Sequence, residues 1–393
     1  MHKARLALLT GTHLVNDLYQ GVIPAMLPFL MTERHYGYAA VSGLAFAASG
    51  VSSLFQPLFG IVADRGNRSW LVPAGFCTAA SGVVAAGLAT SYPLTWLWLA
   101  VAGIGIAAFH PPATSQARLA GGTSQRAMSV FSVGGTLGGA LAPGLVTLVI
   151  GRLGFGGSPL LAVPAAVMAV IWLLRRRTPG GAPGTAQKTA AAAPARADDW
   201  RAFGRLVVVI IGWSIPFVTV TSLISLHAQR DLGRSTAASA AVLTCFTAAG
   251  AAGTLLGGWA GDRYGRLVAL RTGFLVSLPA LAAVAWAPTY VVLAVAATVL
   301  GTGMFLPFAA QVTLAQDYLP SRPGTASGLT LGLAMAAGGL CAPLFGRLAD
   351  AGGLRTTFWV LVAVFAGCVV LALRLADPLR ATPAPHEVLA AQR

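Results

Sequence analysis

The chain has 393 residues, of which 56% are hydrophobic and 9% are charged, and its mean hydropathy is +0.74. Soluble proteins carry charges on about a quarter of their residues, so this composition excludes an ordinary soluble protein. The formal charge of +15 does not indicate a nucleic-acid partner, because the basic residues lie between apolar runs. A spanning helix needs about 20 apolar residues, so twelve helices would use this length and leave no room for a large soluble domain.

Apolar stretches of bilayer length follow one another along the chain. We predict an all-α membrane protein with twelve transmembrane helices in two six-helix bundles. The bundles would comprise residues 1–178 and 205–393, joined by a Pro/Ala/Gly-rich cytoplasmic linker at 179–204. The predicted spans are 6–30, 40–63, 71–90, 94–116, 127–150, 159–175, 205–228, 237–260, 267–287, 290–315, 325–348 and 356–375.

The basic residues predict the orientation of the chain. With both termini inside, 20 of the 26 Lys and Arg residues fall on the inner side and 6 on the outer side. Positive residues favour the cytoplasmic side, so we predict that both termini are cytoplasmic. Lys occurs only twice among these 26 residues, a composition typical of GC-rich bacterial genomes. We therefore predict a multi-pass protein of a bacterial inner membrane.

The sequence shows no pattern that indicates an enzyme. Cysteines occur within apolar runs, far apart and without histidine partners, so they predict neither a disulfide framework nor a metal site. Nucleophile motifs and nucleotide-binding loops are also missing from the sequence. We expect no enzymatic activity, no cofactor and no metal. The four cysteines are Cys77, Cys245, Cys341 and Cys368.

The two halves of the sequence repeat each other at an offset of 198 residues. A Gly-x-x-x-Asp-Arg loop follows the second span and again the eighth. Glycine in such a loop permits close helix approach, and the aspartate can accept hydrogen bonds at the N-terminus of a neighbouring helix. The pair Gly103 and Gly105 recurs as Gly301 and Gly303 at the same offset. We therefore predict two parallel repeats, as in rocking transporters.

This paired loop is the signature of the major facilitator superfamily, which the sequence resembles over essentially its whole length. The resemblance implies the major facilitator fold and a loop that clamps one conformation of the alternating-access cycle. The alternative is a charged turn that only anchors topology. The implied clamp residues are Gly60, Asp64, Arg65 and Arg68, with Gly258, Asp262, Arg263 and Arg266 in the second half.

Polar residues form one stripe on the first span. His13, Asn16, Asp17 and Gln20 follow the i, i+3, i+4, i+7 spacing of one helical face. Asp17 is about 16 Å along the helix from the start of the span, which places it near mid-bilayer. An ionisable group at that depth is a functional hypothesis by default. The alternative is a structural hydrogen bond to a neighbouring helix.

A histidine in the fourth span falls at roughly the same depth. His110 is followed by Pro111 and Pro112, which remove backbone hydrogen bonds and predict a kink beside it. Histidine titrates near neutral pH and can relay protons, so we predict that His13 and His110 face one cavity. A satisfied hydrogen bond between helices is the alternative for His110.

Three stretches resemble the fosmidomycin-resistance branch of the superfamily. They are residues 13–28, Phe109-His110-Pro111 with Arg118 and then Phe131-Ser132-Val133-Gly134-Gly135 downstream, and Ser327-Gly328-Leu329 leading into Gly338-Gly339. The resemblance implies proton-driven export of an antibiotic. Many relatives continue Phe-His-Pro with Glu, whereas this chain has Pro112. Residues 134–144 loosely resemble the antiporter signature, although small-residue faces are also common packing devices.

We therefore predict a proton-coupled antiporter that exports a small antibiotic-like solute of the fosmidomycin type. Its partners would be the solute, protons and the lipid bilayer, and it would act as a monomer. A proton-coupled importer of a metabolite is the alternative, and a membrane receptor is a remote one. The predicted proton-coupling residues are Asp17, His13 and His110, and the predicted cavity residues are Asn16, Tyr19, Gln20, Arg118, Phe308 and Gln311.

Overall fold

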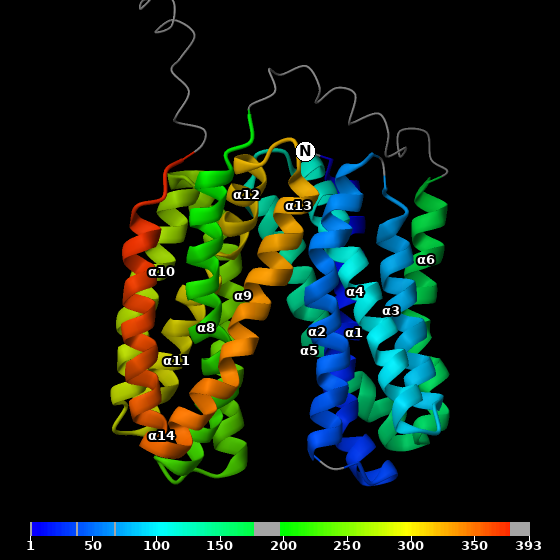
Figure 1. The fold of residues 1–393 in the computed structure, drawn as a ribbon, viewed down its shortest axis with the longest axis horizontal. Helices are drawn as coiled ribbons and strands as arrows, with labels where there is room; N and C mark the ends of the chain where they lie inside the picture. Colours follow the sequence, from blue (N-terminus) through cyan, green and yellow to red (C-terminus); the bar gives the residue numbers. More distant parts are fainter. Residues whose placement is uncertain (1, 37, 67, 177–196, 378–393) are drawn as a thin grey trace, which may run out of the picture. The chain divides into compact units, whose positions relative to one another are not determined.

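The structure, a computed structural model, describes residues 2–36, 38–66, 68–176 and 197–377. Within these residues it contains helices and no strand (Figure 1). The first helices are α1 (Lys3–Arg34), α2 (Tyr38–Asp64), α3 (Leu71–Leu88), α4 (Tyr92–Gly121), α5 (Gln125–Leu153), η1 (Phe155–Ala162) and α6 (Val163–Arg176). They are followed by α8 (Trp200–Arg230), α9 (Thr236–Tyr264), α10 (Arg266–Trp286), α11 (Tyr290–Phe305), α12 (Phe308–Tyr318), α13 (Pro323–Gly328), η3 (Leu329–Leu333) and α14 (Ala334–Leu373).

Local sequence accounts for several helix ends. The Ser124 hydroxyl accepts from the amide of Ala127 at 3.2 Å and caps the start of α5, as a serine N-cap does. Helix α5 ends at Gly154, where φ is 62°, a conformation that favours glycine. The Asp199 carboxylate accepts from the amide of Ala202 at 2.9 Å and caps α8 in the same way.

The helices follow the predicted spans, with local differences. Helix α8 begins at Trp200, inside the predicted linker 179–204, of which residues 179–196 lie outside the described residues. The predicted span 290–315 is divided into α11 and α12 at Pro307, which lacks an amide hydrogen. The last two predicted spans join in α14, where Gly353 has a non-helical φ of 83°.

Ten helical segments in the described part of the chain are long and apolar enough to cross a bilayer. Helix α1, with its polar stripe, is not among them, and residues 323–373 count as one segment although Gly353 interrupts it. Many large apolar side chains are exposed, Leu54 and Leu340 for example. In a bilayer such side chains contact lipid instead of water. The count of twelve spans stays a prediction.

The chain forms two compact units. The first contains residues 1–196 and 321–336, and the second contains residues 197–320 and 337–393. Residues 321–336, which the predicted halves placed in the second bundle, thus belong to the first unit. The reason is close packing of α13 on α2: a Cβ atom at Gly60 would lie 2.5 Å from the carbonyl oxygen of Gly324.

The structure repeats the packing of each half at the offset of 198 residues. A Cβ atom at Gly103 on α4 would lie 2.3 Å from the carbonyl oxygen of Ala48 on α2. A Cβ atom at Gly301 on α11 would lie 2.1 Å from that of Phe246 on α9. Only glycine permits such backbone contact, which explains why both glycines recur in the sequence repeat.

Candidate functional site

Asp17 lies at the centre of a group of ionisable side chains in the first unit. Its Oδ2 atom is 3.2 Å from Nε2 of His13, one turn earlier on α1. Its Oδ1 atom is 3.2 Å from Nε2 of His110 on α4. The imidazole of His13 is buried, and the side chains of Asp17 and His110 are largely so. The structure thus brings together the three residues predicted to couple protons, which we call the cluster.

The other ring nitrogens determine how the two imidazoles face the carboxylate. Nδ1 of His13 is 2.8 Å from the carbonyl oxygen of Phe131 on α5, and Nδ1 of His110 is 2.9 Å from that of Ile106 on α4. A carbonyl oxygen only accepts, so both Nδ1 atoms donate a hydrogen. Each Nε2 then meets a carboxylate oxygen, and such a contact is attractive only when it contains a proton. The cluster therefore has two proton-dependent contacts.

Aromatic and amide groups surround the cluster. The ring of His13 stacks on Phe131 with centroids 4.3 Å apart, and on Phe109 with centroids 5.8 Å apart. Asn16 is fully buried and donates from Nδ2 to Oδ1 of Asp17 at 3.1 Å. Oδ1 of Asp17 thus contacts both Asn16 and His110, whereas Oδ2 contacts His13.

The cluster is also the group in the described residues whose donor atoms, all within 4.8 Å of one another, could hold a metal ion. Two imidazole nitrogens and a carboxylate oxygen are donor types that zinc accepts. Sequence spacing did not indicate this group, because His110 follows Asp17 by 93 residues and on another helix.

The structure does not bring the remaining predicted cavity residues of the first unit to the cluster. Tyr19 is fully buried, where its hydroxyl donates to the carbonyl of Leu161 at 2.8 Å and accepts from the amide of Ala165 at 3.1 Å. These bonds tie α1 to η1 and α6, which is a packing role. Gln20 is exposed. Arg118 lies in the last turn of α4, about 12 Å along the helix from the cluster histidine.

In the second unit, two predicted cavity residues lie on α12. Gln311 is buried, and its Nε2 atom has no hydrogen-bond partner among the residues that the structure describes. Phe308 is half-buried, with its ring centroid 6.4 Å from that of the buried Trp213. A buried amide without a partner is costly, so Gln311 is a candidate to meet a polar ligand.

The predicted clamp loop of the first half contacts α13. Oδ1 of Asp64 accepts from the amide of Gly324 at 2.6 Å, and Oδ2 accepts from the amide and hydroxyl of Thr325 at 2.8 and 2.6 Å. These amides belong to the first turn of α13, where amides lack partners within the helix. Gly60 permits the close approach, whereas the side chains of Arg65 and Arg68 are exposed.

The corresponding loop of the second half is used differently. Arg266 is buried and forms ion pairs with Asp317 and, at 3.2 Å, with Asp377. Asp262 and Arg263 are exposed and Gly258 is buried. The buried ion pairs of the second copy thus belong to a guanidinium, whereas in the first copy a carboxylate accepts from α13, a difference that the matching sequence motifs do not show.

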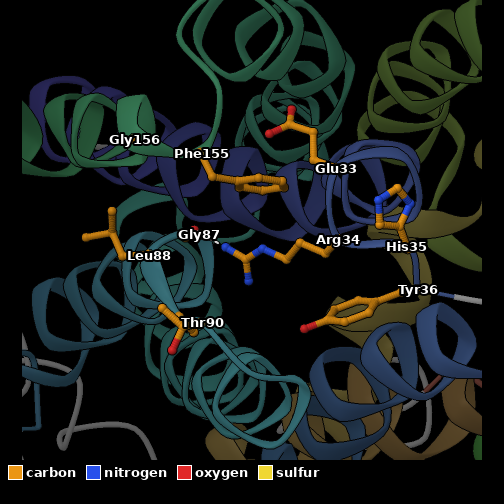
Figure 2. Close-up of a pocket in the computed structure, with 10 residues that line it drawn as sticks. Glu33, Arg34, His35, Tyr36, Gly87, Leu88, Thr90, Phe155 and Gly156 are labelled. Carbon is orange, nitrogen blue, oxygen red and sulfur yellow. Dashed lines mark hydrogen bonds between the residues drawn. The ribbon is translucent and has the colours of Figure 1, made fainter.

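A cavity of about 520 Å³ lies at the other end of α1, away from the cluster (Figure 2). Arg34 crosses it, donates to Thr95 at 3.1 Å and to the carbonyl of Gly87, and stacks 4.6 Å above the ring centroid of Phe155. Arg34 follows Asp17 by 17 residues, about 26 Å along the helix. Because its guanidinium binds carbonyls at the end of α3, it caps that helix. No predicted site residue lines this cavity.

Sequence reasoning missed three parts of the site. The carbonyl of Phe131 is a backbone group, which no residue type signals. Asp64 was expected to accept at the N-terminus of a neighbouring helix, but the sequence did not indicate that this helix is α13. Gly135 on α5, against which the cluster packs, was noted only within the family resemblance and as part of a small-residue face. The signal available for it was the Gly-Gly pair at 134–135, which indicates close approach to another helix.

Comparisons with known proteins agree with this architecture. A family model described as Major Facilitator Superfamily matches residues 9–342 and 219–392. The chain belongs to this superfamily. It is therefore a multi-pass membrane transporter of small-molecule solutes, and its family is not one of enzymes.

Individual relatives are similar over most of the chain. The fosmidomycin resistance protein of Escherichia coli (strain K12) is 30% identical over 354 residues, which cover 88% of this chain and 86% of that protein. The uncharacterized MFS-type transporter YfnC of Bacillus subtilis (strain 168) is 29% identical over 353 residues, with the same coverage. The crystal structure of the transporter FucP in the outward conformation superposes with a TM-score of 0.75 at 15% identity, covering 94% of this chain and 98% of that one. The last likeness concerns the fold alone.

Proposed function

We propose that this transporter exports a small antibiotic-like solute of the fosmidomycin type in exchange for protons. It would act as a monomer in a bacterial inner membrane, with both termini in the cytoplasm. The observation that carries the proposal is the cluster, in which one carboxylate on α1 meets histidines of two helices. The 30% identity to a fosmidomycin resistance protein supports the solute class. It also supports the outward direction, since a transporter lowers the concentration of a drug in the cell by exporting it.

The cluster gives protons a means to act on helix packing. The contact of Asp17 with His13 lies within α1, whereas its contact with His110 joins α1 to α4. When the contact with His110 loses its proton, Asn16 still donates to the same carboxylate oxygen, so the carboxylate keeps a partner while its bond to α4 is lost. Proton binding thus favours one arrangement of the helices, and a solute that favours the other is coupled to it.

We assign solute contacts to polar side chains of both units. Asn16, Gln20 and Arg118 are the candidates in the first unit, and a guanidinium such as that of Arg118 suits an anionic group. In the second unit, Gln311 offers an amide and Phe308 an aromatic face. Tyr19 is left out, because backbone groups already use its hydroxyl.

We further propose that the contact between Asp64 and α13 is the conformational clamp. Gly60 allows the approach, and three hydrogen bonds to one carboxylate hold it. Arg65 and Arg68 would act through their exposed charge. In the second half, Arg266 is the candidate and its neighbours Gly258, Asp262 and Arg263 have the lesser role.

The test is proton movement driven by fosmidomycin in proteoliposomes and everted vesicles. Addition of fosmidomycin to everted vesicles carrying the wild type should dissipate an imposed pH gradient, as antiport requires. Asp17→Asn, which lacks the titrating carboxylate, should abolish this proton movement and keep exchange of labelled against unlabelled fosmidomycin. Asp350→Asn, at an exposed carboxylate outside the proposed site and clamp, is the control. Proton movement by Asp17→Asn at the wild-type rate would place coupling elsewhere, and none by the wild type would reject proton antiport of this solute.

A further inference from the structure

Helix α5 packs along α1 and forms one side of the cluster without contributing a charge. Phe131 contacts His13 twice, since its carbonyl accepts from Nδ1 at 2.8 Å and its ring stacks on the imidazole at 4.3 Å with planes 23° apart. The carbonyl keeps Nδ1 as a donor, so the ring nitrogen that faces Asp17 is Nε2. The parallel stack fixes the plane of the imidazole from α5.

Gly135 lies one turn after Phe131 on the same face of α5. A Cβ atom there would lie 2.4 Å from Oδ2 of Asp17 and 2.6 Å from Nε2 of His13, the two atoms of their hydrogen bond. Even one methyl group would therefore have to displace the carboxylate or the imidazole. Gly135 is needed at this position because the pair of ionisable groups occupies the space of its side chain.

Gly139 provides a matched comparison one turn further along. A Cβ atom at Gly139 would meet no atom within 4 Å. Alanine at residue 139 therefore makes the same change in helix propensity as alanine at residue 135, without touching the cluster. The two glycines therefore separate the change in helix propensity from the geometry of the proton-binding pair.

We propose that Phe131 and Gly135 are positioning residues for proton coupling, which fix His13 and Asp17 in hydrogen-bonding geometry from α5. This inference rests on the proposed proton-coupled function. Within the described residues, the titratable group that another helix places beside His13 and Asp17 is His110 on α4. Helix α5 contributes Phe131 and Gly135, which do not titrate. The two positions should therefore affect proton coupling more than solute binding.

The experiment measures fosmidomycin-driven proton flux and fosmidomycin exchange in proteoliposomes for wild type, Gly135→Ala and Gly139→Ala. We expect Gly135→Ala to lose at least 90% of the proton flux and to keep exchange within about twofold, because its methyl group separates Asp17 from His13. Gly139→Ala should behave as wild type. Equal proton flux in the two alanine variants would overturn the inference.

A second pair of variants decides the case if Gly135→Ala fails to insert. Phe131→Leu removes the aromatic face, and Phe131→Tyr keeps it. Without the stacked ring, the imidazole of His13 is no longer held in its plane from α5. Phe131→Leu should therefore lose most of the fosmidomycin-driven proton flux and keep fosmidomycin exchange within about twofold. Phe131→Tyr should keep this proton flux.

Wild-type proton flux in Phe131→Leu would overturn the inference. The same measurements also distinguish the proposed function from this further inference. A wild type that moves no protons with fosmidomycin overturns the proposed function and this inference with it. A coupled wild type that loses coupling in Asp17→Asn, but not in Gly135→Ala or Phe131→Leu, overturns the inference alone.

Discussion

Neutralising Asp64 should unlock the first turn of α13. Three donors on Gly324 and Thr325 converge on its two carboxylate oxygens. In Asp64→Asn, one of these oxygens becomes an NH2 group, which cannot accept from a backbone amide. One amide of α13 therefore loses its acceptor and the other keeps a neutral one.

The size of the effect follows from these contacts. A hydrogen bond to a charged group contributes about 1.5–3 kcal/mol and one to a neutral group about 1 kcal/mol. Losing one charged bond and weakening another would cost about 3 kcal/mol, which we reduce to about 2 kcal/mol because Asp64 is half-exposed. At 1.4 kcal/mol per tenfold, the contact should open about 30-fold more often.

Hydrogen–deuterium exchange detects this opening directly, because the affected amides are those whose bonds are lost. Peptides covering residues 321–328 should exchange about 30-fold faster in Asp64→Asn, and fosmidomycin transport should fall while membrane insertion is kept. Asp262→Asn, at the matching exposed position, should leave these peptides unchanged. Wild-type exchange rates in Asp64→Asn would show that the carboxylate does not hold α13.

Further variants test the cluster and the repeat. His110→Ala removes the ion pair that joins Asp17 on α1 to α4, so proton-driven export should fall about tenfold or more. Pro112→Ala should change the rate and keep the ratio of protons to solute, and equal effects of the two variants would contradict the assignment. Gly103→Ala places a methyl group against a carbonyl oxygen and should cost about 1–3 kcal/mol, seen as a lower thermal midpoint in detergent. Gly144→Ala, which meets no atom within 4 Å, is its control, and similar midpoints for both would refute the packing argument.

The course of the helices was predictable because bilayer length and hydropathy act locally. The breaks within the helices were less predictable. Pro307 lies inside a predicted span, yet whether a proline kinks or divides a helix depends on the groups around it. The packing of residues 321–336 with the first unit depends on two glycines, Gly60 and Gly324, that lie 264 residues apart in sequence. No local pattern indicates that their backbones meet.

The site was predictable where its chemistry sits on side chains at helical spacing. His13 and Asp17 share a face of one helix, so their contact follows from the sequence, and His110 could be placed by depth. Phe131 acts partly through its carbonyl, and Gly135 acts through the side chain that it lacks, so neither carries a polar group that sequence reasoning would select. Tyr19 has a polar group of the expected kind, but backbone partners already occupy it.

The membership of residues 321–336 in the first unit has a consequence for biosynthesis. After residue 196, the ribosome must add 140 residues, 197–336, before that unit has all of its parts. At about 5–20 residues per second, this takes about 7–28 s. During that interval α2 lies in the membrane with Gly60 and Asp64 lacking their α13 partners. A chain that stops at the linker would stay in this incomplete state, with a helix face and a carboxylate open to membrane proteases or to other helices.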